Sequence, residues 1–112
     1  MDDNVGFLDA ARDLLERQGV RVVGVASTSA EALVRVDETR PEVVLVDIDL
    51  GPESGFDVAR LFADRPDPVP VLLISTYAER DLAELIQASP AVGFLSKREI
   101  SKRAIDELLG RA

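Results

Sequence analysis

The chain has 112 residues, enough for one domain with a single hydrophobic core, and a formal net charge of −8. The acidic balance argues against direct binding to nucleic acid or to an anionic membrane, and the lack of cysteine and histidine excludes disulfides, thiolate nucleophiles, the usual zinc sites and a Ser/His/Asp triad. No apolar run approaches the roughly 20 residues of a membrane span, and the acidic start is unlike a signal peptide. We therefore expect one cytoplasmic domain, residues 1–112, with chemistry based on carboxylates, hydroxyls and lysine.

Helical and strand-like patterns alternate from the start of the chain. Apolar residues at helical spacing follow Asn4, which can cap a helix, and Gly19 is placed to end it. The segment Val20–Ala26 is β-branched and almost wholly apolar, which is typical of a strand covered on both faces. Ser29 can cap a second helix, which must stop near Arg40 because a proline follows.

The same alternation continues to the end of the chain. Further predicted helices run through Phe56 and Phe62, through Leu82 and Ile86, and after Ser101, which can cap the last one. The further predicted strands are Val43–Val46, Val71–Ile74 and Ala91–Leu95. Apolar strands that alternate with helices predict an α/β fold, a doubly wound parallel sheet with helices on both faces.

Polar side chains follow the predicted strands at their carboxyl ends, where the binding sites of such sheets gather. Asp47 follows one strand, Ser75 follows the next, and Lys97 lies just past the last. If Asp2 and Asp3 also end a strand, three carboxylates would face a hydroxyl and an ammonium. Carboxylate oxygens suit Mg²⁺, and the other two groups can bind phosphoryl oxygens. The pattern therefore indicates a site for a divalent cation and a phosphoryl group.

Each of these residues has a simpler use when it is taken alone. Asp2 and Asp3 could stabilise the dipole of the first helix, and Asp47 could be a turn residue. Ser75 could cap the helix that follows, and Phe94 is most simply a core residue. These separate uses do not explain why three kinds of polar group should meet at one sheet edge.

The order of these groups resembles the receiver domain of two-component response regulators, and the resemblance covers nearly the whole chain. In that family an acidic pair ends the first strand, an aspartate that ends the third accepts phosphate, a Ser or Thr ends the fourth, and a lysine follows the fifth. The resemblance implies a flavodoxin-like fold with strand order 2-1-3-4-5. It also implies a signalling module and not an enzyme.

The resemblance assigns a role to each matching residue. Asp47 would be the phosphoacceptor, and its phosphoryl group would come from a sensor histidine kinase. Ser75 and Lys97 would bind the phosphoryl oxygens. The implied ligands of Mg²⁺ are Asp2, Asp3, Asp47 and the backbone carbonyl of Asp49.

Other positions match the family or depart from it. Ser75 and Phe94 occupy the positions of the family's switch pair, and Gly55 matches the glycine that begins its third helix. The family usually has proline directly after the residue equivalent to Leu50, whereas here Gly51 comes first, so we expect a different loop shape beside the site. A possible homodimer would form through the terminal helices or by strand exchange.

The first strand of a receiver is the largest departure. That strand is central in the family's sheet and supplies about five apolar residues before the acidic pair, whereas only Met1 precedes Asp2 here. We expect a truncated or missing first strand, with Val20–Ala26 and Val43–Val46 facing a gap. Five buried side chains contribute on the order of 10 kcal/mol, comparable with the whole stability of a domain. Either the strand lies upstream of Met1, or strand exchange or another chain fills the gap.

Two other functions stay open. The stretch VLVDIDLG also resembles the nucleophile motif of haloacid-dehalogenase-type phosphatases, with Asp47 as nucleophile and Asp49 as general acid. Ser75 and Lys97 would suit the next motifs of that family, but its later acidic pair has no counterpart outside a predicted helix. A pseudo-receiver, which binds partners without being phosphorylated, is the third hypothesis.

Overall fold

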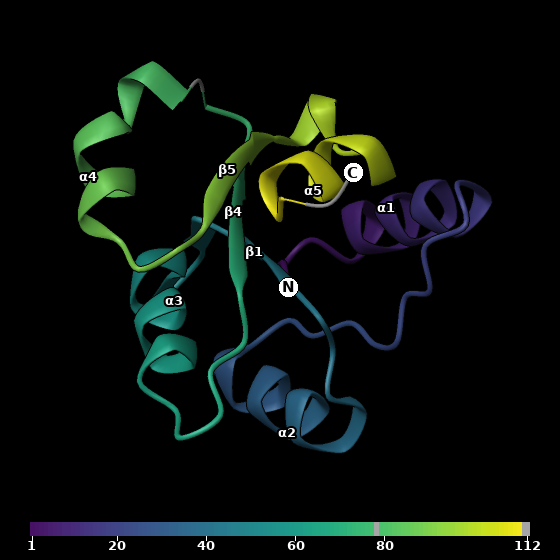
Figure 1. Cartoon of the computed structure of the whole chain (residues 1–112), viewed down its shortest axis with the longest axis horizontal. Helices are drawn as coiled ribbons and strands as arrows, with labels where there is room; N and C mark the ends of the chain where they lie inside the picture. Colours follow the sequence, from purple (N-terminus) through teal and green to yellow (C-terminus); the bar gives the residue numbers. More distant parts are fainter. Residues whose placement is uncertain (78, 111–112) are drawn as a thin grey trace.

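A computed structural model describes residues 1–77 and 79–110, which form an α/β fold with helices on both faces of a parallel sheet (Figure 1). The strands of this sheet lie in the order β1-β4-β5, and both neighbouring pairs are parallel. They are β1 (Val44–Asp47), β4 (Val71–Ser75) and β5 (Gly93–Ser96). A short antiparallel hairpin follows β1 and consists of β2 (Asp49–Leu50) and β3 (Glu53–Ser54).

Five α-helices surround the sheet in the described part of the chain. They are α1 (Val5–Arg17), α2 (Ser29–Thr39), α3 (Gly55–Ala63), α4 (Ala83–Ala88) and α5 (Lys102–Leu108). Helices α2, α3 and α4 pack on one face, while α1 and α5 pack on the other (Figure 1). Two short 3₁₀ turns, Glu79–Asp81 and Lys97–Glu99, follow β4 and β5. None of the helices described is long and apolar enough to cross a membrane.

Strand β4 connects the two halves of the hydrophobic core. Val71 and Leu73 belong to the core cluster on the side of α3, whereas Leu72 and Ile74 belong to the cluster on the side of α5. Successive side chains of a strand point to opposite faces, so a strand covered on both sides must be apolar throughout. The predicted doubly wound architecture is therefore confirmed in this part of the sheet.

The helix ends follow the sequence signals, with one correction. The Asn4 side chain caps α1, Gly19 with a φ of +87° follows its last turn, and Ser101 caps α5. The cap of α2 is Thr28, not Ser29 as predicted, because the Thr28 side chain accepts the hydrogen bond from the helix and Ser29 is the first helical residue. The two neighbours are both hydroxyl residues, so the sequence pattern does not separate them.

The predicted strand Val20–Ala26 is wrong as a strand, since no residue in it is assigned to a sheet. Among the described residues, its backbone bond toward the sheet runs from the Asp2 N–H to the carbonyl of Ala26, at 3.1 Å. Met1 bonds the outer edge of β1, where its amine donates to the carbonyl of Leu45 and its carbonyl accepts the N–H of Asp47. A strand needs a hydrogen-bonding neighbour along its length, and Met1 and Asp2 supply such a neighbour only at the end of Val20–Ala26.

Candidate functional site

The carboxyl ends of β1, β4 and β5 lie side by side, as the sequence predicts. Asp47 is the last residue of β1 and pairs with Ile74, Ser75 is the last residue of β4 and pairs with Ser96, and Lys97 follows β5 directly. This register brings a carboxylate, a hydroxyl and an ammonium to one sheet edge. The edge is the place where α/β sheets build their binding sites.

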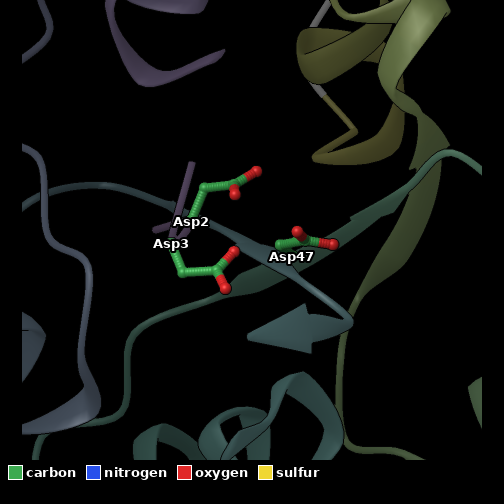
Figure 2. Close-up of side chains that lie close together, drawn as sticks. All are labelled: Asp2, Asp3 and Asp47. Atoms are coloured by element: carbon green, nitrogen blue, oxygen red, sulfur yellow. The ribbon is translucent and has the colours of Figure 1, made fainter. Parts of the chain in front are cut away.

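The N-terminal residues add two carboxylates to this edge (Figure 2). One oxygen from each of Asp2, Asp3 and Asp47 lies within 4.8 Å of the others. Asp2 and Asp47 are buried and Asp3 is exposed, so the group is open on one side. Three carboxylates at this spacing match the oxygen ligands that Mg²⁺ prefers, and a cation coordinated through one or two of them with several waters fits the open side.

Lys97 neutralises the buried part of the cluster. Its Nζ donates to Asp2 Oδ2 at 2.6 Å and to Asp47 Oδ2 at 3.1 Å, and the Lys97 side chain is only 15% exposed. Burial by itself lowers the pKa of this amine, but the hydrogen bonds and charges of Asp2 and Asp47 outweigh it, so the Lys97 pKa is raised. Lys97 is therefore a cation in the site.

The Asp47 carboxyl has a raised pKa, and burial is the largest cause. The bond from Lys97 and the bond from the Asp49 N–H, at 3.2 Å, oppose the shift without cancelling it. Burial of a carboxylate disfavours its charged form, and a cation nearby restores that form. A divalent cation at the cluster would therefore favour the ionised carboxylate, the form that can act as a nucleophile.

The loop after Asp47 packs against the end of β1, next to the site. Asp49 is exposed in β2, and its side chain accepts the N–H of Gly51, whose φ of +72° makes the hairpin turn. Gly55 packs against β1 so closely that a Cβ there would lie 2.1 Å from the Asp47 carbonyl oxygen. Only glycine fits at such a distance. The metal-ligand role predicted for the Asp49 carbonyl stays a prediction.

The two predicted switch residues lie on neighbouring strands. Ser75 is buried, and its Oγ accepts the N–H of Tyr77 at 3.0 Å, so the hydroxyl supports the turn after β4. Phe94 is 8% exposed, belongs to the core cluster on the side of α3, and lines a cavity of about 330 Å³ with Thr76 and Tyr77. The simpler use of Phe94 as a core residue is therefore confirmed, whereas Ser75 supports a turn and does not cap the helix that follows, whose N-cap is Leu82. The switch roles stay predictions.

Two contacts of the site region were not predicted. Phe7, expected only as a core residue of the first helix, places its ring 4.3 Å from Lys97 Nζ. Glu53, to which no role was given, accepts the Ser29 N–H at 2.9 Å and also the Ser29 hydroxyl. Helical spacing marks Phe7 as inward-facing, but no pattern in the sequence points to the partner of either residue.

Comparison with known proteins places the geometry in a family. A protein family model, the response regulator receiver domain, matches residues 1–109. A curated relative, the protein-glutamate methylesterase/protein-glutamine glutaminase of Halobacterium salinarum, is 30% identical over 88 residues, which cover 79% of this chain and 25% of that protein. The chain thus spans about a quarter of the first curated relatives it matches.

Solved structures agree with this match. The signal receiver domain of the putative response regulator NarL from Mycobacterium tuberculosis is 33% identical, with a TM-score of 0.82, 98% of this chain covered and 93% of that one. A response regulator protein from Burkholderia pseudomallei, solved with a phosphorylated aspartic acid, a calcium ion and citrate, is 29% identical with a TM-score of 0.78, covering 96% of this chain and 62% of that one. The chain belongs to the response regulator receiver domain family of two-component signalling.

Proposed function

We propose that Asp47 accepts a phosphoryl group from the phosphohistidine of a sensor histidine kinase, with Mg²⁺ present, and that the transfer changes the contacts of the domain with its partners. The observation that carries the proposal is the position of Asp47, a buried carboxylate bonded to Lys97 and grouped with Asp2 and Asp3. A nucleophile that attacks a phosphoryl group needs cationic groups close by, because negative charge gathers on the phosphoryl oxygens.

In the transfer, one carboxylate oxygen of Asp47 forms a new bond to phosphorus while the bond from phosphorus to the donor breaks. The electron pair of the broken bond leaves with the donor nitrogen, which takes a proton, and the product is an acyl phosphate. Lys97 gives hydrogen bonds to the phosphoryl oxygens in place of a carboxylate, and Ser75 donates its hydroxyl proton, which the bond it accepts from the Tyr77 N–H leaves free.

Asp2, Asp3 and Asp47 are the side chains that would hold Mg²⁺, with the carbonyl of Asp49 as a further ligand. Bound there, Mg²⁺ supplies positive charge to the phosphoryl oxygens. Asp3 is the exposed member and would hold the ion on the open side of the cluster, and Asp2 is fixed by its bond from the Asn4 N–H at 2.9 Å.

Ser75 and Phe94 are the proposed switch. Ser75 Oγ accepts the Tyr77 N–H and keeps its own proton free to donate, so a shift of the Ser75 side chain toward a phosphoryl oxygen would pull on the turn after β4. The cavity that Phe94, Thr76 and Tyr77 line lies beside that turn, so a shift of the turn alters its shape. Partners that bind this surface would therefore distinguish the phosphorylated domain from the unphosphorylated one. We propose that residues 1–112 act as one receiver unit in the cytoplasm. The chain has no cysteine, so its folding does not depend on disulfides or on an oxidising compartment.

The alternatives differ in what happens to phosphate. A dehalogenase-type phosphatase would use Asp49 as general acid, but the matching family model is that of receivers. Some relatives are protein-glutamate methylesterases/protein-glutamine glutaminases, and this chain covers only about a quarter of their length. A pseudo-receiver with the same fold would take no phosphoryl group at all.

Acetyl phosphate or phosphoramidate with Mg²⁺ tests the proposal. The intact mass of the protein should rise by one phosphoryl group, and peptide mapping should place the label on Asp47. Asp47→Asn should abolish the gain, whereas Asp57→Asn, a change of the same type in the first turn of α3, should keep it. Label that persists in Asp47→Asn contradicts the assignment, no gain in the native chain favours the pseudo-receiver, and steady turnover of a phosphate ester favours the phosphatase.

A titration of Mg²⁺ separates the metal ligands from the phosphoryl group's partners. Asp3→Ala should weaken Mg²⁺ affinity, because the ion loses one of three carboxylates. Lys97→Ala should lower phosphoryl acceptance more than Mg²⁺ affinity, because an ammonium repels the cation and attracts the phosphoryl oxygens. Isothermal titration calorimetry measures the Mg²⁺ affinity of each variant, and the gain in intact mass measures its phosphoryl acceptance. An unchanged Mg²⁺ affinity in Asp3→Ala argues against the metal site.

A further inference from the structure

The ammonium of Lys97 has a third neighbour besides its two carboxylates. Its Nζ lies over the Phe7 ring, 4.3 Å from the centroid. A cation over an aromatic face is attracted by the negative charge of the ring's π system, and the attraction grows where water is excluded. The Lys97 side chain is 15% exposed, and Phe7 is partly buried against the core cluster on the side of α5. The contact is therefore close and poorly hydrated.

The position of the Phe7 ring is tied to the acidic cluster through the cap of α1. Asp2 Oδ1 accepts the Asn4 N–H at 2.9 Å, and Asn4 Oδ1 accepts the Phe7 N–H at 3.0 Å. Two consecutive hydrogen bonds thus connect a carboxylate of the site to the first turn of α1. A shift of that turn relative to Asp2 would break one of them, so the ring keeps its place beside the site.

The ring differs from the other neighbours of Lys97 in what a metal ion does to it. Asp2 and Asp47 bond Lys97 and are also candidate ligands of Mg²⁺, so the ammonium and the ion would share the same two carboxylates. Phe7 has no oxygen to give and no charge to be neutralised. Its attraction for the ammonium would therefore persist if the carboxylates bound a metal ion, and the ring would then be a contact that holds Lys97 in the site.

We propose that Phe7 is a positioning residue that holds Lys97 beside Asp47 during phosphoryl acceptance. The inference rests on the proposed function, in which Lys97 binds a phosphoryl oxygen. Lysine ends a flexible four-carbon stem, and a ring that restricts this stem reduces the freedom that is lost when the ammonium meets the phosphoryl group. Phe7 carries no atom that could ligate a metal ion or donate to a phosphoryl oxygen, so it acts through Lys97.

Three changes at position 7 separate the charge distribution of the ring from its size. Phe7→Tyr keeps the aromatic face, Phe7→Leu keeps an apolar side chain without it, and 3,4,5-trifluorophenylalanine at this position keeps the ring shape but removes most of the negative charge of its face. We expect the leucine and trifluoro variants to accept phosphate from acetyl phosphate about threefold to thirtyfold more slowly, the range of a cation–π contact, and the Phe7→Tyr variant to stay within about twofold of the native rate.

Leu14→Ala, a change elsewhere on α1, is the control and should leave the rate unchanged, with thermal unfolding checked for every variant. Native rates in both the leucine and trifluoro variants overturn the inference. Equal slowing in all three variants also overturns it, because packing alone would then explain the loss. The trifluoro variant keeps the shape of the ring, so its result does not depend on tolerance of a smaller side chain.

Nuclear magnetic resonance gives a second measurement that needs no phosphate. The Cε protons of Lys97 should be shifted upfield by the Phe7 ring, should stay shifted in saturating Mg²⁺, and should lose the shift in Phe7→Leu. Loss of the shift on addition of Mg²⁺ overturns the inference. If the native chain takes no phosphoryl group while the shift persists in Mg²⁺, the proposed function fails and the contact itself stands.

Discussion

Two apolar segments of similar composition, β4 and Val20–Ala26, behave differently in this fold. Every residue of β4 is buried, and its register with β1 and β5 is continuous. In Val20–Ala26 only Ala26 is buried, and within the part of the chain that the structure describes only its carbonyl bonds toward the sheet, through Asp2. The comparison teaches that β-branched, apolar residues do not make a strand by themselves, because a strand is stabilised by neighbours that take its backbone bonds and cover its faces.

The consequence is an unequal division of the site. Asp47, Ser75 and Lys97 stand on or next to strands that pair with β4 or belong to it, whereas Asp2 and Asp3 stand on a segment held by a few terminal bonds. The half that would bind the phosphoryl group is placed by strand pairing, and part of the half that would bind the metal depends on the N-terminal residues. Each prediction below tests one half or the connection between the two.

The largest expected effect comes from the tightly packed half. Gly55→Ala places a Cβ 2.1 Å from the Asp47 carbonyl oxygen and 2.7 Å from the Ile48 Cα, and backbone atoms cannot move aside as a flexible side chain can. We expect a loss of about 4 kcal/mol or more in the free energy of unfolding, measured with urea. Gly6→Ala in α1 is the matched control and should gain about 0.5–1 kcal/mol. A Gly55 variant within about 1 kcal/mol of the native chain would show that β1 and α3 can separate freely.

The connection between the halves is Lys97, the one residue that bonds both Asp2 and Asp47 in the described part of the chain. Lys97→Met leaves these two buried carboxylates without their shared cation, and such a change in a buried ion pair costs about 3 kcal/mol. Added Mg²⁺ should restore much of this stability, because it offers the carboxylates another cation and binds the folded state. Urea unfolding with and without MgCl₂ measures both effects.

The control for that comparison is Lys102→Met, because Lys102 is about half exposed and pairs with Asp106 one turn along α5. Its loss should change stability by less than about 0.5 kcal/mol and should not respond to Mg²⁺. If the two lysine variants behave alike, the buried cluster is not held together by Lys97.

The sequence was sufficient for the half of the site that lies on complete strands. Asp47, Ser75 and Lys97 were placed at one edge by a rule about parallel strands, and they lie there because β1, β4 and β5 pair in the expected order. The order β1-β4-β5 corresponds to the last three positions of the predicted order 2-1-3-4-5. In the described part of the chain the first two positions are not strands. The apolar pattern of Val20–Ala26 predicts a strand, but it carries no information about whether a neighbouring strand is present to pair with it.

The side-chain contacts across elements were beyond sequence reasoning for a different reason. Phe7 meets Lys97, and Glu53 meets Ser29, at separations along the chain that no periodicity covers. Helical spacing gives the direction of Phe7 to within a face of α1, but the partner depends on how α1 packs against the end of β5. Patterns with a period of two or 3.6 residues describe one element at a time, so contacts between elements need the assembled fold.

The role of the weakly paired half can be tested by adding a neighbouring strand. Four or five Val, Ile and Leu residues joined ahead of Met1 should lie between Val20–Ala26 and β1, and they should raise the free energy of unfolding by about 2 kcal/mol relative to a Gly/Ser extension of the same length. The extension also removes the buried amine of Met1, whose pKa burial lowers to about 6. Equal stability of the two extended chains in urea, at equal molecular mass in solution, would contradict the idea that this edge needs a strand.

The smallest expected effect concerns the hairpin β2–β3, which connects the tightly packed half to α2. Glu53 accepts hydrogen bonds from the Ser29 hydroxyl and the Ser29 N–H, and these bonds lower the Glu53 pKa below its ordinary value of 4.5. A carboxyl with a lowered pKa in the folded state contributes stability that is present above the unfolded value and is lost as the pH falls through the lowered one.

Ser29→Ala removes the hydroxyl, the larger cause, and leaves the backbone N–H in place. We therefore expect the Glu53 pKa to return toward 4.5, which a ¹³C titration of its side-chain carboxyl measures, and the midpoint of acid unfolding to move slightly upward in pH. Ser27→Ala, two residues earlier in the loop, removes a hydroxyl that does not reach Glu53 and should leave both values as they are. Because Glu53 remains partly exposed to solvent, the effect on the site should be small. A Ser29 variant in which phosphoryl acceptance falls as far as in Lys97→Ala would show that the position of this hairpin controls Asp47. Helix α2 would then belong to the half of the site that binds the phosphoryl group.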